Sequence, residues 1–288
     1  MTTISPTLDL PTRVAAAPLR RRSSLAAVAT LARRRLALSA RTPRELLIPI
    51  MTPLLFAIVI APALADTFGA APGGVDYMTF VAVSTLGLLV PLSCAQSGLG
   101  VVVDRLGGAQ RDLLAAPIRR SLIVVGNLVV AVALSALQVA VVVGASALRG
   151  AEYDVSLTGA GWFAAATLGF AVAMYAVAEV LANRLATQED YIAALPAVAI
   201  VPYFFAGGLF PISALPAALT VVAKVLPITH VLALMRYGLV DRSGQGLHDI
   251  WGMSNTTAMA TLSLAYVGLF AAALTAASVR VFSRTAVS

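Results

Sequence analysis

The stretch FFAGGLFPISALP, residues Phe204–Pro216, decides how the rest of this sequence is interpreted. It is apolar enough for the interior of a membrane, yet it contains the pair Gly207-Gly208 and two prolines, Pro211 and Pro216. A proline lacks the backbone N–H and clashes with the carbonyl four residues earlier, so a helix that reaches Pro211 must end or kink there. We therefore predict a broken helix at this point, and the flanking sequence indicates the environment in which it lies.

The composition is that of a membrane protein. Of the 288 residues, 59% are hydrophobic and 11% are charged, and the mean hydropathy is +0.90, whereas roughly a quarter of the residues in soluble domains are charged. The net charge of +7 would suit a nucleic-acid-binding face, but the basic residues stand at the ends of apolar runs, as topology signals do. The single cysteine, Cys94, lies in an apolar run, so we expect a buried thiol and no disulfide within the chain.

Six intervals free of Asp, Glu, Lys and Arg are long enough for a membrane-spanning helix, which needs about 20 residues. We therefore predict an all-α polytopic membrane protein with six transmembrane helices. The predicted spans are about 46–65, 78–102, 121–146, 160–183, 191–210 and 256–279. Residues 1–23 are predicted to form a disordered cytoplasmic tail, and residues 24–288 a single transmembrane domain.

The distribution of basic residues predicts the orientation. Sixteen of the 20 lysines and arginines fall on the side of the membrane that both termini share, and basic residues near span ends stay on the cytoplasmic side. Trp162 and Trp251 fall at the ends of spans on the other side, as expected of an aromatic belt. Arginine-rich usage with one lysine, Lys224, is typical of a high-GC bacterium. We expect a multi-pass protein of the bacterial plasma membrane with both termini in the cytoplasm.

The segment from about Ser24 to Ala40 has a basic flank and an apolar run, which a signal peptide also has. Three consecutive arginines, Arg33 to Arg35, interrupt that run, and no cleavage motif precedes the first span. We therefore predict an interfacial helix that lies on the cytoplasmic membrane surface. Arg35 falls within its apolar arc, and we expect this long side chain to snorkel to the lipid headgroups.

The spans contain almost no ionisable side chains, and those are the usual mark of chemistry inside a bilayer. Glu179 is the exception, and it is either a structural carboxylate paired with Arg184 or a residue with a role in coupling or assembly. The two histidines, His230 and His248, are expected at the surface or interface rather than at a metal site. The sequence contains no phosphate-binding loop and no hydrolase or metalloprotease motif. We predict no catalytic residue, no metal and no cofactor in this chain, so energy for any transport must come from a partner.

On the external side, the sequence after the broken helix is apolar but too interrupted to span the membrane again. Pro216, Pro227, Lys224 and Arg236 divide it into short pieces. Non-helical backbone at membrane depth is tolerated only where it is buried in protein or lines a watery cavity. We therefore predict re-entrant helices over residues 211–240, which form either a vestibule or a packed plug. The break itself is assigned to Gly207, Gly208, Pro211 and Pro216.

On the cytoplasmic side, the loop DRLGGAQRDLLAAPIRRS, Asp104–Ser121, has a related construction. Gly107 and Gly108 are expected to end the second span, Ala109–Ala116 to form a short helix, and Pro117 to close it. The charged side chains of this segment, Arg105, Arg111 and Asp112 among them, would be exposed. The segment is either a solvated topological loop or a docking helix for a soluble partner.

The two segments together resemble those of the ABC type-2 transporter permease family, in particular its daunorubicin-resistance-like and polyketide-antibiotic-exporter branch. The resemblance covers about Ser24 to Arg284 and includes the pattern F-x-x-G-x-x-F-P-x-x-x-x-P, followed by a further proline and a later arginine. In this sequence these residues are Phe204, Gly207, Phe210, Pro211, Pro216, Pro227 and Arg236. Many members carry an arginine followed by an acidic residue at the start of the cytoplasmic loop, whereas here Asp104 precedes Arg105.

The resemblance implies a permease subunit of an ATP-driven exporter. Such a subunit pairs with a second permease chain of the same or a related sequence and with two ABC ATPase subunits, which bind ATP and Mg²⁺. The residues that would couple to the ATPases are Arg105, Gly108, Arg111, Asp112 and Pro117. Six-span membrane proteins also include scaffolds and assembly factors that transport nothing, and this is the alternative function. A secondary transporter would need carboxylates near the midplane, which are absent.

The resemblance also places the substrate pathway between the two permease copies, lined by the second and fifth spans. Candidate lining residues are Ser93, Gln96, Tyr203 and Phe204, each of which would serve equally well in ordinary helix packing. A lining without charge suits a hydrophobic or amphipathic cargo such as a drug, an antibiotic or a lipid, so the implied activities are efflux and antibiotic resistance.

Overall fold

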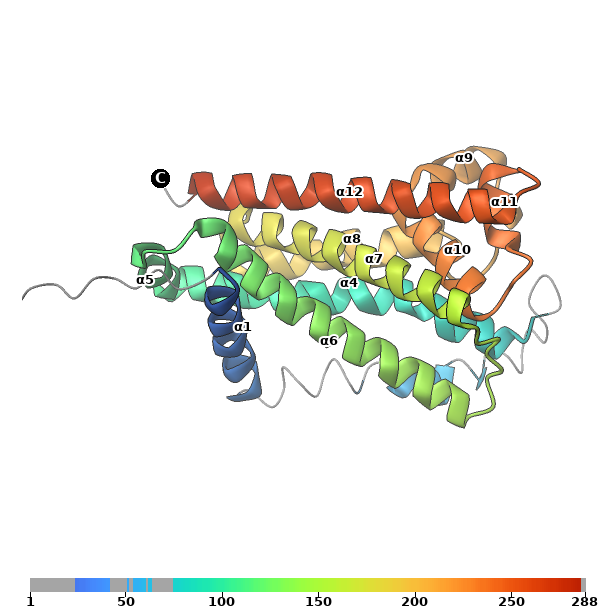
Figure 1. Cartoon of the computed structure of the whole chain (residues 1–288), viewed down its shortest axis with the longest axis horizontal. Helices are drawn as coiled ribbons and strands as arrows, with labels where there is room; N and C mark the ends of the chain where they lie inside the picture. Colours follow the sequence, from blue (N-terminus) through green and yellow to red (C-terminus); the bar gives the residue numbers. More distant parts are fainter. Residues whose placement is uncertain (1–23, 42–50, 52–53, 61, 64–74, 286–288) are drawn as a thin grey trace, which may run out of the picture.

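The computed structural model describes residues 24–41, 51, 54–60, 62–63 and 75–285, and its elements are helices joined by turns (Figure 1). The elements are α1 (Ser24–Arg41), the π-helical turn η1 (Phe56–Ile60), α4 (Tyr77–Leu106), α5 (Ala109–Ala115), α6 (Arg120–Leu148), α7 (Leu157–Arg184), α8 (Gln188–Phe205), the 3₁₀ turn η2 (Ile212–Ala214), α9 (Ala217–Val225), α10 (Pro227–Leu239), α11 (Gln245–Trp251) and α12 (Thr256–Thr285). The prediction of an all-α membrane protein is confirmed.

Four helices, α4, α6, α7 and α12, are long and apolar enough to cross a membrane. They correspond to the predicted spans 78–102, 121–146, 160–183 and 256–279, and they run along the long axis of the molecule (Figure 1). Taken as one bent span, α9 and α10 would be a fifth. The predicted span 46–65 and the predicted tail 1–23 lie largely or wholly outside the described residues, so the count of six stays a prediction.

Helix α4 is the centre of the bundle. In its most apolar stretch 89% of the residues are buried, because α6, α7, α8 and α10 all contact this helix. Cys94 lies on this helix with no exposed surface, 3.4 Å from the carbonyl of Ala171 on α7, so the predicted buried thiol is confirmed. The position of α4 means that a displacement at one end of the bundle can reach the other end through a single helix.

The backbones of helices α7 and α10 approach each other closely at one crossing, between Gly159 and Gly238. A Cβ atom built on Gly159 of α7 would lie 2.2 Å from the backbone oxygen of Gly238, and one built on Gly238 would lie 2.6 Å from the oxygen of Gly159. Small residues at such crossings let helix backbones approach closely, and this packing replaces the hydrophobic driving force that is missing in a bilayer. Neither position therefore has room for a larger residue.

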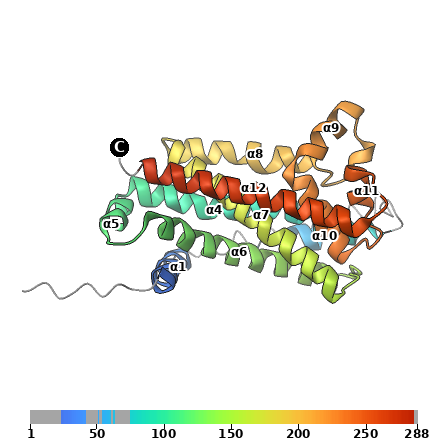
Figure 2. The ribbon, with the colours of Figure 1, turned by 45° about the horizontal axis from the view of Figure 1, so that its top comes forward.

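Helix α1 lies across one end of the bundle rather than along it (Figures 1 and 2). It packs on α6 and reaches α4 through ion pairs of its arginines. Gly126 of α6 allows α1 to pack closely, because a Cβ atom on Gly126 would be 2.7 Å from Cβ of Leu31. Leu25, in the first turn of α1, remains 83% exposed. The predicted helix at the N-terminus is confirmed, and its position on a membrane surface stays a prediction.

Helix α8 is shorter than the predicted span 191–210. Its 18 residues extend about 27 Å at 1.5 Å per residue, slightly less than the roughly 30 Å of a hydrocarbon core. It ends at Phe205, where Gly207 takes a left-handed φ of +77° and the N–H of Gly208 bonds to the carbonyl of Tyr203 at 3.2 Å. This is a glycine-terminated helix end. The prediction that Pro211 ends the helix is wrong, because the chain has already turned at Gly207.

The segment that follows turns sharply a second time. Helices α9 and α10 are separated by the single residue Leu226, and their axes differ by 81°. Most of α10 is buried against α4, α7, α11 and α12, whereas α9 exposes Val221, Val222 and Val225. The predicted pair of short helices after the break is therefore present. It lies at the opposite end of the bundle from α5 (Figure 1).

Candidate functional site

The α5 segment forms one end of the bundle. Gly108 supplies a left-handed turn, with φ of +82°, before α5 begins at Ala109. Leu113 and Leu114 pack against the core, whereas the side chains of Arg111 and Asp112 are exposed. The short amphipathic helix is confirmed, although it ends one residue earlier than predicted. Pro117 follows it in an exposed turn.

Arg105 does not belong to this exposed surface. Its Nη2 atom donates to the carbonyl of Leu185 at 2.5 Å and to that of Ala186 at 3.2 Å. These carbonyls lie just after the end of α7, where helical carbonyls lack partners within the helix. Arg105 therefore joins the end of α4 to the end of α7, and the structure does not place it with Arg111 and Asp112 as a docking surface.

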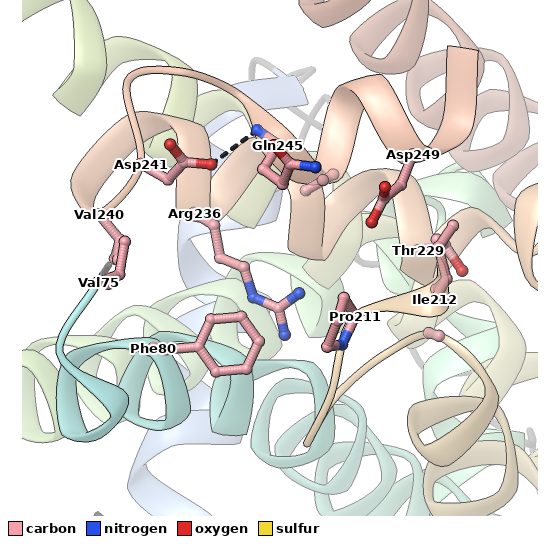
Figure 3. Close-up of a pocket in the computed structure, with 13 residues that line it drawn as sticks. Val75, Phe80, Pro211, Ile212, Thr229, Arg236, Val240, Asp241, Gln245 and Asp249 are labelled. Atoms are coloured by element: carbon pink, nitrogen blue, oxygen red, sulfur yellow. Dashed lines mark hydrogen bonds between the residues drawn. The ribbon is translucent and has the colours of Figure 1, made fainter. Parts of the chain in front are cut away.

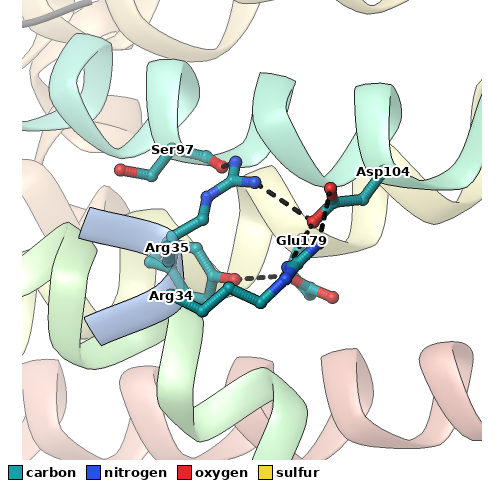
Figure 4. Close-up of polar contacts among 6 residues, drawn as sticks. Arg34, Arg35, Ser97, Asp104 and Glu179 are labelled. Carbon is teal, nitrogen blue, oxygen red and sulfur yellow. Dashed lines mark hydrogen bonds and ion pairs between the residues drawn. The ribbon is translucent and has the colours of Figure 1, made fainter. Parts of the chain in front are cut away.

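Two arginines of α1 hold Asp104 of α4 (Figure 4). Arg34 Nη1 and Arg35 Nη1 lie 3.3 and 3.2 Å from Asp104 Oδ2, and Arg35 Nη2 donates to the carbonyl of Ser97 at 2.9 Å. Arg35 is only 7% exposed, so the prediction that it snorkels to lipid headgroups is wrong. Gly100 makes the contact feasible, because a Cβ atom there would lie 1.3 Å from Arg35 Nη2. The Asp104 carboxylate and the Ser97 carbonyl of α4 accept the hydrogen bonds of the Arg35 guanidinium, in place of lipid headgroups.

Glu179 lies beside this cluster on α7 and has no exposed surface (Figure 4). It accepts hydrogen bonds from the hydroxyl of Tyr175 at 2.5 Å and from Nδ2 of Asn183 at 3.1 Å, both one turn away on the same helix. The charge of Arg35 also acts on it. The side chain of Arg184 is exposed, so the predicted pairing of Glu179 with Arg184 is wrong. The arginines of α1 thus join it to α4 through Asp104 and Ser97, whereas both of these Glu179 hydrogen bonds lie within α7.

At the opposite end, Arg236 of α10 is buried and holds the broken end of α8 (Figure 3). Its Nη2 donates to the carbonyl of Gly207 at 2.6 Å, and Nε and Nη2 donate to Oγ of Ser84 on α4 at 3.0 and 2.6 Å. The guanidinium carbon lies 3.9 Å from the ring centre of Phe80. Among the described residues these partners are all neutral, and an arginine stays charged in such a site. In the sequence, Arg236 interrupts an apolar segment and belongs to the family pattern, and neither feature indicates these partners.

The space around Arg236 is small. A cavity of about 40 Å³ lies among Phe80, Pro211, Arg236, Asp241 and Asp249 (Figure 3), which is room for a few water molecules. The two alternatives for this end were a vestibule and a packed plug, and the conformation described here is packed. Pro216 immediately precedes α9, in an extended conformation with ψ of 143°.

The two histidines lie in this end of the molecule. His230 is only 2% exposed, so its predicted place at the surface or interface is wrong. It lies in a hydrogen-bonded cluster with Trp251 and Ser263. His248 is half-buried on α11. Within the described ranges no three His, Cys, Asp or Glu side chains are grouped closely enough to hold a metal ion.

The four candidate pathway residues do not form one site. Ser93 and Tyr203 are 1% and 2% exposed and lie in the packed interior. Gln96 of α4 is exposed, and Phe204 of α8 is 46% exposed. The first pair therefore serves helix packing within this chain. The second pair faces outward, where a further chain or lipid would meet it.

One comparison with known proteins identifies the family. The model of the family described as ABC-2 type transporter matches residues 26–240, from α1 through α10. The match includes the α5 segment, the Arg34–Arg35–Asp104 cluster and the break after α8. No curated protein sequence matches the chain. The chain therefore belongs to the ABC-2 type transporter family and is a multi-pass membrane permease component of an ABC transporter.

Proposed function

We propose that this chain is the permease subunit of an ATP-driven exporter, with its α5 end and both termini in the cytoplasm of a bacterial cell. Two ABC ATPase subunits, carrying ATP and Mg²⁺, would dock at α1 and α5, and a second permease chain, identical or related, would complete the pathway. The observation that carries the proposal is the position of two unlike segments at opposite ends of one bundle (Figure 1). One is an exposed charged helix, and the other is a sharply bent helix pair of which α10 is buried and α9 is largely exposed.

The contacts at the α5 end support a mechanical role. A force on α1 would pass to α4 through Asp104, because Arg34 and Arg35 both bind that carboxylate. A force on α4 would also reach α7 through Arg105, which binds the carbonyls just after that helix. These are charge-assisted contacts, which are shorter and stronger than neutral hydrogen bonds. Movement of the ATPases would therefore displace three helices together.

The far end of α4 supports transmission to the exit. Ser84 of α4 accepts from Arg236 of α10, and the same guanidinium binds Gly207 at the end of α8. Displacement of α4 would strain this joint, loosen the re-entrant pair and open the exit. Residues 211–240 would thus act as the external gate.

The substrate is expected to be hydrophobic or amphipathic, such as a drug, an antibiotic or a lipid. Helix α8 supports this because it buries only Tyr191, Ala199 and Tyr203 and leaves the rest of its apolar surface to be covered from outside. Gln96 is an exposed amide on α4, a helix whose most apolar stretch is 89% buried. A polar group inside a membrane needs a protein or water partner. A second permease chain against α4 and α8 would provide that partner and enclose the pathway.

The decisive experiment is purification of the tagged chain from its native membrane in mild detergent. We expect an ABC ATPase to co-purify and the reconstituted complex to hydrolyse ATP and export a hydrophobic dye. The double charge reversal R111E/D112R should weaken ATPase retention. The matched control is the reversal D154R/R242D, which acts on an exposed ion pair at the other end. A chain that purifies without any nucleotide hydrolase, or that retains it without transport, would favour the alternative of a membrane scaffold.

A further inference from the structure

Helices α6 and α7 lie side by side (Figures 1 and 2) and leave an open groove of about 370 Å³ between them. Six residues of α6, between Val132 and Val143, and five residues of α7, between Phe163 and Ala171, line it. This volume lies within the range of small-molecule sites, about 300–1,000 Å³. None of the lining side chains is charged, so the groove offers an apolar ligand a place on the outside of the bundle.

Helix α4 closes the back of the groove. Two of the lining residues, Ser135 of α6 and Ala171 of α7, both contact Cys94 of α4, whose Sγ atom is 3.6 Å from the Ser135 hydroxyl and 3.4 Å from the Ala171 carbonyl. Cys94 has no exposed surface, whereas Leu168, another lining residue, is 52% exposed. The groove is therefore closed toward the interior and open toward the surroundings of the bundle, which for a membrane-spanning chain are lipid.

The two hydroxyl groups of the lining already have partners within the protein. Ser135 has the contact with Cys94, and Oγ1 of Thr167 donates to the carbonyl of Phe163 at 2.7 Å. A polar ligand in the groove would give up hydrogen bonds to water and gain few in return, which costs free energy. An alkyl chain has no such bonds to give up, so the lining favours it.

Two glycines extend the groove toward the end of the bundle opposite α5. Gly144 follows the lining residue Ala140 by four positions, and Gly161 precedes the lining residue Ala164 by three, so each glycine neighbours a lining alanine on the surface of its helix. Among the described residues, the space where a Cβ atom would lie is open at both glycines. A chain in the groove can therefore continue past them to the ends of the two helices.

An exposed arginine lies at that end of the bundle. Leu148 and Leu157, at the adjoining ends of α6 and α7, are 91% and 93% exposed, which is favourable in hydrocarbon and unfavourable in water. We therefore expect Arg149, which follows Leu148, at the level of the lipid headgroups, where long basic side chains reach. It is exposed, makes no ion pair among the described residues, and lies about 7.5 Å beyond Gly144 along the helix axis.

We propose that the groove between α6 and α7 binds one acyl chain of a phospholipid and that Arg149 binds the phosphate of the same molecule. A guanidinium binds a phosphate through two parallel hydrogen bonds. Glu152, three residues after Arg149, is also exposed and can accept from an amine, so phosphatidylethanolamine matches both charges. The lipid belongs to the leaflet at the end opposite α5, which is the outer leaflet in the proposed orientation.

A lipid chain gains more contact here than elsewhere on the lipid-facing surface. On the exposed face of α12 it would touch one convex helix, whereas in the groove it touches α6 and α7 together. The described part of the first predicted span, η1, contacts α6 and α4 and contributes no residue to the lining. The groove should therefore retain one phospholipid, while lipid around α12 exchanges freely.

Photolabelling tests the site with a phosphatidylethanolamine that carries a diazirine in the middle of one acyl chain. The full chain is purified in mild detergent, mixed with increasing amounts of this probe and irradiated, and its tryptic peptides are analysed by mass spectrometry. Cleavage at Arg120, Arg149 and Arg184 separates α6 from α7, and the peptide that contains α12 reports ordinary lipid contact. We expect labelling of α6 and α7 to saturate at one probe per chain and labelling of α12 to rise without saturation.

Variants that fill the groove show whether the labelling depends on it. A140F and A164F each place a ring at an exposed lining position, and exclusion of only two CH₂ groups of the lipid weakens binding about tenfold. The matched control A272F places the same ring at an exposed position of α12 and should not change the labelling of α6 and α7. Labelling of α6 and α7 that rises in step with α12, or that persists in both A140F and A164F, would overturn the acyl-chain site.

The variant R149Q tests the phosphate contact separately. It should weaken labelling by the phosphatidylethanolamine probe about tenfold and leave labelling by a diacylglycerol with the same diazirine chain unchanged. The labelled peptide then spans both helices, because a cleavage site is lost. An equal loss with both lipids, or a loss with neither, would overturn the role of Arg149. These measurements need no ATPase and no cargo, so failure of the lipid site is separable from failure of the proposed exporter function.

Discussion

Removal of the Ser84 hydroxyl tests whether Arg236 is the joint between α4, α8 and α10. In S84A the guanidinium loses the acceptor that Nε and Nη2 share at 3.0 and 2.6 Å, while the contact of Nη2 with Gly207 remains. Hydrogen bonds to charged groups contribute about 1.5–3 kcal/mol each, and a buried donor left without a partner costs about 1–3 kcal/mol. We expect S84A to lower the free energy of unfolding by about 2–4 kcal/mol.

A double-mutant cycle isolates this contact. R236M removes the buried charge and its desolvation cost but leaves the Gly207 carbonyl without a partner. In the double variant S84A/R236M no guanidinium remains to lose its acceptor, so the losses of unfolding free energy from the two single variants should not add. We expect a coupling free energy of about 1.5–3 kcal/mol. S278A is the matched control, because the buried hydroxyl of Ser278 donates to the carbonyl of Thr275 on its own helix.

The assay is thermal unfolding of the purified chain in detergent, followed by circular dichroism. The midpoint falls by about 2–4 °C for each kcal/mol of lost stability in a large domain, so S84A should lower it by about 4–16 °C. S278A combined with R236M should give the sum of the single shifts. Additive shifts for S84A and R236M would refute the joint, as would a midpoint of S84A equal to that of the unchanged protein.

Three further predictions concern other parts of the molecule. Gly207 has a left-handed φ, and a Cβ atom there would lie 2.8 Å from the Phe210 oxygen. We therefore expect G207A to lower the unfolding midpoint and P211A to change it much less. A larger loss in P211A than in G207A, measured by thermal melts, would show that the proline ends the helix. In G126L the new side chain should collide with Leu31 and displace α1 from α6. Proteases should then cleave faster at Arg33 to Arg35. An unchanged cleavage rate would show that α1 does not need this close contact to stay in place. A reporter fused to the C-terminus should be active only in the cytoplasm, and periplasmic activity would contradict the proposed orientation.

The sequence predicts the body of the bundle well, because charges mark the ends of its helices. Four spans follow from intervals without charged residues, and α5 follows from Gly108 and Pro117 on either side of a short amphipathic run. The buried thiol of Cys94 follows from its apolar surroundings. The predicted end of α8, at residue 210, is too far along the chain. Gly207 and Pro211 can both end a helix, and only the observed φ of Gly207 shows that the glycine does so first.

The polar joints were harder to predict, because their partners are distant in sequence. The sequence predicts that Arg35 reaches lipid headgroups, because its actual partner, Asp104, lies 69 residues away and no local pattern connects the two. The contacts of Arg236 with Ser84 span 152 residues, and no local pattern indicates them. Glu179 is different, since its partners Tyr175 and Asn183 stand four residues before and after it, where side chains of one helix meet. That spacing was visible in the sequence and indicated a local network rather than a pair with Arg184.

The direct backbone contact between Gly159 and Gly238 restricts how the proposed gate could move. The two main chains touch at this crossing, so tilting α7 or α10 toward the other would drive one main chain into the other. Larger rotations are therefore left to α9, beyond Leu226. A gate built in this way would open mainly by rotation of α9, while α10 shifts only slightly.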